Sequence, residues 1–194
     1  MKSLNFIILL LILPISIFGQ VNNDPVRIYS KGIQYYLNPS TEYFKPEIVF
    51  IETPSFELPE YSISIEIRDG NYILSHKSFI QSYWPKVLHS FSKSDEMVKS
   101  EIIKKEFVIS KRFAEKIIYR TGSVLKIDHS KFEKAAQVDG SSFYIEDKTN
   151  KRAIKELELK QNNDYLQLVR FFQRLKNTFN DLKLNEEEVE KQLN

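Results

Sequence analysis

Residues 61–80 read YSISIEIRDGNYILSHKSFI and carry the clearest local pattern of the chain. Isoleucines alternate with polar residues up to Asp69-Gly70, which is the period of a strand with one buried face. Asp-Gly is favoured in two-residue hairpin turns because both central residues need a positive φ. A turn at these two residues fixes one register. The predicted facing pairs are Ile67 with Tyr72, Ile65 with Leu74, and Ile63 with His76.

Further segments rich in β-branched and aromatic residues predict additional strands, the first three of which are bounded by Pro, Gly or Asn. They are residues 26–29, 33–37, 47–53, 102–109 and 142–146. The stretch from Asp147 to Asn150 predicts a turn after the last of them. Residues 152–159 fit neither the strand period nor the helix period, so a strand and a helical turn both stay open there.

Two longer segments have the period of a helix. Ser110 is a good N-cap, and the apolar residues that follow it predict a helix over about 111–127. Asn163 or Asp164 caps a second predicted helix over about 163–182, whose apolar residues are spaced 3-4-3-4-3. The sequence therefore predicts an α+β fold: a mostly antiparallel sheet with these two principal helices packed on one face.

The first twenty residues have the three parts of a secretory signal peptide. Lys2 gives a basic start, residues 6–13 are apolar, and Gly19 is a small residue before Gln20. The apolar run is shorter than the roughly 20 residues that a membrane span needs. We therefore expect residues 1–19 to be a signal peptide that is cut between Gly19 and Gln20.

Residues 20–194 have the length of a single α+β domain, in which 183–194 form a charged tail. The leader, which is rich in Leu and Ile and ends Phe-Gly-Gln, resembles the leaders of exported proteins from certain Gram-negative bacteria. Residues 138–144, VDGSSFY, resemble a turn and strand that recurs in small exported proteins. These resemblances imply a periplasmic or secreted location and no particular activity.

Composition excludes several classes of function. The chain has no cysteine, so disulfides, thiol nucleophiles and Cys-based metal sites are excluded. With 28 basic and 26 acidic residues it lacks the basic excess of a nucleic-acid binder. No other segment is apolar enough to span a membrane once the signal is removed. Isolated glycines and three scattered histidines provide no phosphate loop and no metal-ligand spacing, so we expect no cofactor and no metal.

His76 and the pair Tyr83-Trp84 are the first candidate functional residues. His76 falls on the apolar face of the predicted hairpin, where it is either a core histidine or the base of a small extracytoplasmic hydrolase. Tyr83-Trp84-Pro85 predicts a turn that carries large rings. These rings either close the edge of the core or stack on sugars in a carbohydrate-binding domain.

A basic strip is the third candidate. Arg112, Lys116 and Arg120 are four residues apart and lie on one side of the predicted helix. The strip is either a docking surface for an acidic protein or an anionic envelope component, or a solvated face balanced by acidic residues of the tail. Because no catalytic motif is present, the sequence favours an exported, non-catalytic binding module, with the hydrolase and the carbohydrate-binding domain as alternatives.

Overall fold

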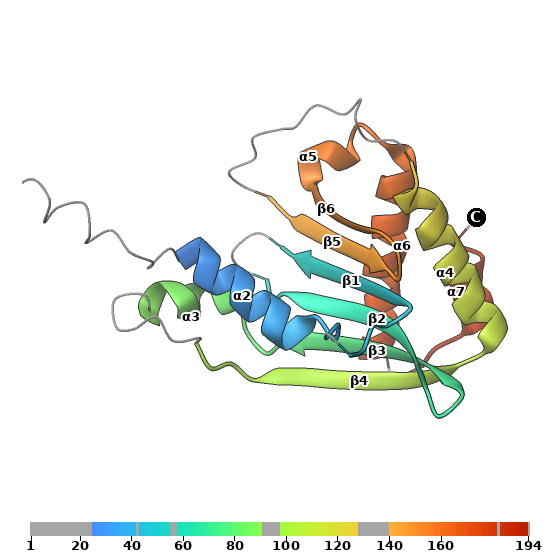
Figure 1. Ribbon diagram of the computed structural model, residues 1–194, viewed down its shortest axis with the longest axis horizontal. Helices are drawn as coiled ribbons and strands as arrows, with labels where there is room; N and C mark the ends of the chain where they lie inside the picture. Colours follow the sequence, from blue (N-terminus) through green and yellow to red (C-terminus); the bar gives the residue numbers. More distant parts are fainter. Residues whose placement is uncertain are drawn as a thin grey trace, which may run out of the picture.

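A computed structural model describes residues 25–41, 43–54, 58–90, 98–127, 140–181 and 183–193. The strands are β1 (Ile48–Thr53), β2 (Tyr61–Arg68), β3 (Asn71–Phe79), β4 (Ile102–Ile109), β5 (Ser142–Asp147) and β6 (Lys151–Lys155). The helices are α2 (Pro25–Leu37), α3 (Tyr83–Ser90), α4 (Lys111–Leu125), α5 (Glu156–Leu159), α6 (Asn163–Asn180) and α7 (Glu186–Glu190). The strands form one antiparallel sheet in the order β4-β3-β2-β1-β5-β6, so the predicted α+β class is confirmed (Figure 1).

The β2–β3 hairpin forms as predicted. Asp69 and Gly70 both have positive φ, 51° and 78°. The register pairs Ile67 with Tyr72, Ile65 with Leu74, and Ile63 with His76, as the sequence predicts. Strand β1 pairs with the outer side of β2, and β4 pairs with the outer side of β3. The hairpin therefore lies at the centre of four strands and decides which side chains face each side of the sheet.

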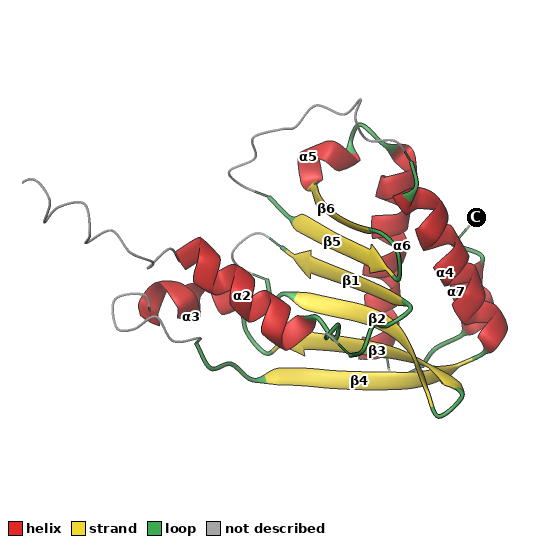
Figure 2. Ribbon diagram, viewed as in Figure 1, coloured by secondary structure: helices red, strands yellow, loops and turns green. Residues whose placement is uncertain are grey.

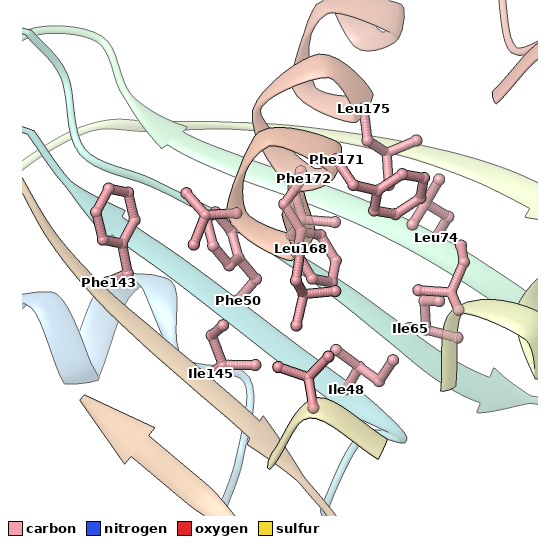
Figure 3. Packing of buried hydrophobic residues seen from close by; sticks show 14 of the residues in the cluster. Ile48, Phe50, Ile65, Leu74, Phe143, Ile145, Leu168, Phe171, Phe172 and Leu175 are labelled. Atoms are coloured by element: carbon pink, nitrogen blue, oxygen red, sulfur yellow. The ribbon is translucent and has the colours of Figure 1, made fainter. Parts of the chain in front are cut away.

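The two principal predicted helices pack on one face of the sheet, which we call the α6 face. Phe172 of α6 stacks on Phe50 of β1 with 4.6 Å between ring centroids. Figure 3 shows Leu168 and Leu175 of α6 within the same cluster as Ile65 of β2. Parallel stacking and dense apolar contact at this face make it the main core of the protein.

The ends of these helices differ slightly from the prediction. Helix α4 begins after Ser110, whose hydroxyl accepts a hydrogen bond from the Phe113 N–H, and it ends at Leu125 rather than near residue 127. The cap of α6 is Asn162, one residue before the predicted caps, and the helix ends at Asn180. A side-chain oxygen of Asn162 accepts from two of the first N–H groups, which is why the helix begins there.

Helices α2 and α3 cover part of the opposite face, which we call the α2 face (Figure 2). The prediction of strands at 26–29 and 33–37 was wrong, because both segments belong to α2. Pro25 suits the first turn of a helix, where its missing N–H has no partner to lose. The buried residues of α2 follow a helical spacing and pack on Val49 and Ile51 of β1; they are Ile28, Gly32, Ile33 and Leu37.

Residues 152–159, for which the sequence left a strand and a helical turn open, contain both. The segment contributes to strand β6 up to Lys155 and then turns into the short helix α5. The predicted turn at 147–150 also forms, with the Asp147 carboxylate accepting from the N–H groups of Thr149 and Asn150. Within residues 183–193, α7 buries Val189 against the main core, so this part of the charged tail is packed on the domain.

Gly32 allows α2 and α3 to approach closely. A Cβ at this position would overlap the ring of Tyr83, which is itself stacked on Phe79 of β3 with 4.8 Å between centroids. The Tyr83 ring has little room to move, because it also packs against Phe79, Tyr29 and Tyr36. The small residue in the middle of α2 is therefore a packing requirement at the helix pair.

We expect Gly32→Ala to lower the free energy of unfolding by about 1–2 kcal/mol in urea titrations, since overpacking outweighs the gain in helix propensity. Gly122→Ala in α4 is the matched control, because its Cβ would meet only the Asp147 carboxylate, at 3.3 Å. That variant should stay within about 1 kcal/mol of the natural protein. Equal stability of the Gly32 variant and the natural protein would show that the two helices are not in this contact.

Candidate functional site

His76 lies on the α6 face beneath the last turn of α6. Its side chain is buried, with 5% of the residue exposed, and stacks on Phe179 with 5.1 Å between centroids. Neither ring nitrogen has a hydrogen-bond partner in the part of the chain that the structure describes. Burial, together with the positive charges of Lys176 and Lys105, lowers its pKa to about 4. The imidazole is therefore neutral at pH 7, and no described carboxylate or hydroxyl orients it as a general base.

A buried polar network lies beside His76 and joins α6 to the sheet. The Tyr61 hydroxyl donates to the Glu52 carboxylate, and the Gln173 amide donates to the same carboxylate at 3.1 Å. The Lys176 ammonium lies 4.1 Å from the centroid of the Tyr61 ring. Burial and the neighbouring carboxylate raise the pKa of Tyr61 well above its usual range. Because Tyr61 of β2 and Gln173 of α6 both donate to Glu52 of β1, this network links α6 to the sheet, and Tyr61 stays protonated.

Tyr83 and Trp84 begin helix α3 instead of forming the predicted turn. Tyr83 is fully buried, and burial raises its pKa to about 12. Trp84 is half-buried and packs edge-on against Tyr29 with 5.1 Å between centroids. Buried Glu60 accepts a 2.8 Å hydrogen bond from the Tyr83 N–H and so caps this helix. The two rings hold α3 against α2 and do not form an exposed stacking platform.

The basic strip of α4 is paired with acidic residues. Arg112 and Lys116 both reach Glu190 of α7, and the Arg112 contact is 3.1 Å long. Arg120 reaches Asp164 at the start of α6 at 2.9 Å. These pairs are partly exposed, so each contributes little to stability, but they neutralise much of the strip. The acidic tail balances Arg112 and Lys116, which is the alternative that the sequence left open.

Arg120 also borders a groove of about 190 Å³ between α4, α6 and the residues that follow α7. Two further arginines line it, Arg170 and Arg174, one turn apart on the exposed side of α6. Among the described residues, no carboxylate pairs with Arg170 or Arg174, and no acidic residue lines the groove. The remaining lining residues are Gln167, Leu168, Phe171, Gln192 and Leu193. Guanidinium groups thus surround an apolar floor, an arrangement that can hold an anion.

The sequence predicts the α4 side of this groove, which we call the arginine groove, but not the α6 side. The predicted basic strip includes Arg120 of α4 but neither Arg170 nor Arg174, which are four residues apart on the second predicted helix. Their spacing was visible in the sequence, but the packing of α4 on α6 that brings them to Arg120 was not. The buried acids Glu52 and Glu60 also carried no sequence signal, since Glu52 follows an unbroken apolar run and Glu60 precedes the alternating strand.

No group of three or more His, Asp or Glu residues in the described ranges is arranged to hold a metal ion. His89 is exposed on α3, and His129 lies outside the described residues. None of the described helices combines the length and apolar character needed to cross a bilayer.

We expect His76→Phe to leave the free energy of unfolding at pH 7.5 unchanged or slightly raised, because a ring with no hydrogen-bond partner is replaced by one that needs none. The pKa in the folded state, about 4, is below the ordinary 6.5. The unfolded chain therefore binds the proton more readily, and the natural protein loses stability as the pH falls from 6.5 towards 4.

Urea titrations at pH 7.5 and pH 5 measure this difference, and the variant should lose less stability between them than the natural protein, by about 2 kcal/mol. Other acidic groups titrate in both proteins, so the comparison isolates His76. A loss of more than about 2 kcal/mol on substitution at pH 7.5 would instead mean that the imidazole makes a hydrogen bond.

Comparison with known families, proteins and structures gives no match for this chain. No family model, no curated protein and no solved structure matches it. The predicted signal peptide and residues 138–139 lie outside the described residues, and no comparison tests the resemblance of either segment, so both resemblances stay predictions. Among the described side chains, those that line the arginine groove give the clearest indication of a ligand, which is an anion.

Proposed function

We propose that the chain is an exported, non-catalytic binding module that holds a phosphate-bearing component of the cell envelope in the arginine groove. The observation that carries this proposal is the pair Arg170 and Arg174 beside one groove, with no acid among the lining residues that the structure describes. Arg120 also lines the groove and is held by Asp164 at 2.9 Å. The signal-like leader supports the location, and the groove supports the ligand class.

The placement of Arg170 and Arg174 costs the folded protein free energy. Like charges four residues apart on a helix repel by a few tenths of a kcal/mol. Arg112 and Lys116, by contrast, share Glu190 as an acidic partner, which offsets their mutual repulsion. An uncompensated pair beside a groove is accounted for by an anion that binds there.

The chemistry of the groove suits phosphate. A guanidinium presents parallel N–H donors that match two oxygens of a phosphate, and it stays charged at any physiological pH. The groove is smaller than the roughly 300 Å³ of typical drug-sized pockets, so it accepts a compact headgroup and not an extended substrate. Leu168 and Phe171 supply an apolar floor on which the carbon atoms next to the phosphate can rest.

The other functions considered have weaker support. A hydrolase at His76 lacks a described partner for either ring nitrogen, and a sugar platform at Tyr83 lacks an exposed ring face. The basic strip remains part of the proposal through Arg120 alone, because that residue belongs to both the strip and the groove.

We expect sodium phosphate to stabilise the purified protein against heat more than sodium chloride of the same ionic strength. Ligand at ten times its Kd adds about 1.4 kcal/mol by mass action. Arg170→Gln/Arg174→Gln should lose this specific increment. Arg112→Gln/Lys116→Gln is the matched control, since it removes the same charge from residues that are already paired, and it should respond to phosphate as the natural protein does.

Flotation with vesicles then tests the source of the phosphate. Binding to phosphatidylglycerol vesicles and not to phosphatidylcholine vesicles, lost in the Arg170/Arg174 variant, would identify a lipid headgroup. Response to free phosphate without vesicle binding would identify a soluble phosphate compound. An equal phosphate response in all three proteins, or binding only to acidic proteins, would overturn the proposed ligand.

A further inference from the structure

Strand β4 forms an edge of the sheet, and its outer side has backbone groups that no described strand pairs with (Figure 1). The hydrogen bond from the Ile80 N–H to the Glu101 carbonyl, 3.4 Å long, fixes the phase of the β3–β4 ladder. Odd-numbered residues of β4 therefore bond to β3. Even-numbered residues, from Ile102 to Val108, direct their N–H and C=O groups outward.

Several side chains of this edge strand are both apolar and exposed. Val108 is 71% exposed, Ile103 43% and Ile102 38%. A long edge strand with exposed apolar residues is a template for a further strand, which proteins commonly prevent with charged residues on the edge. Lys104 and Glu106 are such charges, but they have opposite signs, so their effect depends on what lies opposite them.

We propose that β4 pairs antiparallel with β4 of a second copy of the chain, about a two-fold axis at Lys105. This joins the two sheets into one continuous sheet. Lys104 of each copy then faces Glu106 of the other on the α2 face, and Ile102 faces Val108 there. On the α6 face, Ile103 of each copy faces Phe107 of the other.

Only this register matches both charge and apolarity. A shift by one step in one direction would place Lys104 opposite itself and Ile102 opposite Glu106. A shift in the other direction would place Glu106 opposite itself and Lys104 opposite Val108. Like charges directly opposite one another destabilise a strand pair, whereas opposite charges and apolar pairs stabilise it. The order of residues in β4 is therefore self-complementary in a single arrangement.

The charges at this surface are already held in place within one chain. Glu106 accepts from Arg68 at 3.0 Å and from the Ser75 hydroxyl at 2.8 Å, and Lys104 lies 2.7 Å away. These donors lower the pKa of Glu106 to about 2, so the carboxylate is ionised throughout the physiological range. Side chains that are positioned before binding lose less conformational entropy when the second copy arrives.

Lys105 lies on the proposed two-fold axis, so it faces Lys105 of the second copy. Its ammonium donates a 2.9 Å hydrogen bond to the Phe179 carbonyl in the last turn of α6. This bond draws the Lys105 ammonium towards the C-terminal, negative end of α6 in the same chain and away from the two-fold axis. The two lysines therefore approach through their aliphatic chains while their charges stay apart.

Charge-reversal variants give the sharpest test. Lys104→Glu makes both edge charges negative, and Glu106→Lys makes both positive, so each alone should weaken the dimer about tenfold or more in sedimentation equilibrium. An equimolar mixture of the two variants restores opposite charges at both positions. The mixture should therefore dimerise about as tightly as the natural protein.

Cysteine substitution tests the axis directly, because the chain has no cysteine of its own. Lys105→Cys brings two thiols together at a close, non-hydrogen-bonded pair and should form a disulfide-linked dimer under mild oxidation. Ile103→Cys is the control, since it faces Phe107 and should remain uncrosslinked. A natural protein that stays monomeric at every concentration, or a dimer that ignores both charge reversals, would overturn the proposal.

Discussion

The fold depends on a two-residue turn that requires left-handed backbone at both of its positions. Asp69 and Gly70 adopt positive φ, and this conformation closes the β2–β3 hairpin in a single register. A slip of one residue would move every side chain of a strand to the other face of the sheet. Because β1 and β4 pair with the outer sides of this hairpin, the turn also decides which of their side chains face α6 and which face α2.

The consequences of that register differ at the two faces. On the α6 face it places Tyr61 next to Glu52, and their network with Gln173 holds α6 in position. The position of α6 in turn brings Arg170 and Arg174 towards Arg120 of α4. At the edge of the sheet, the same alternation places Lys104 and Glu106 side by side. Both proposed binding surfaces thus follow from one local constraint, although they lie on different elements.

Much of the fold could be predicted because its main elements have long, regular patterns. The hairpin, α4 and α6 each repeat their period several times, and β4 is rich in β-branched residues, so local pattern is enough to identify them. Helix α2 was missed because Gly32 interrupts its sequence pattern, whereas in the structure that glycine admits the ring of Tyr83. Trp84 was expected in a turn because Pro85 follows it, but a proline is tolerated in the first turn of α3.

The candidate site could be predicted only in part, because its residues are brought together by tertiary packing. Arg112 and Glu190 are 78 positions apart, and Arg120 and Asp164 are 44 apart, so no local pattern indicates that they pair. The arginine groove has the same origin, since α4 and α6 contribute different walls. The basic strip predicted from the sequence shares only Arg120 with this groove.

A pair of introduced cysteines measures the central register most directly. Ile67 and Tyr72 face each other in a non-hydrogen-bonded pair, where Cα atoms are close enough for a disulfide. Ile67→Cys/Tyr72→Cys should therefore oxidise to an intramolecular disulfide, and Ile67→Cys/Ile73→Cys, which matches a slip of one residue, should remain reduced. Efficient crosslinking of the second variant and none of the first would contradict the account of both faces of the sheet.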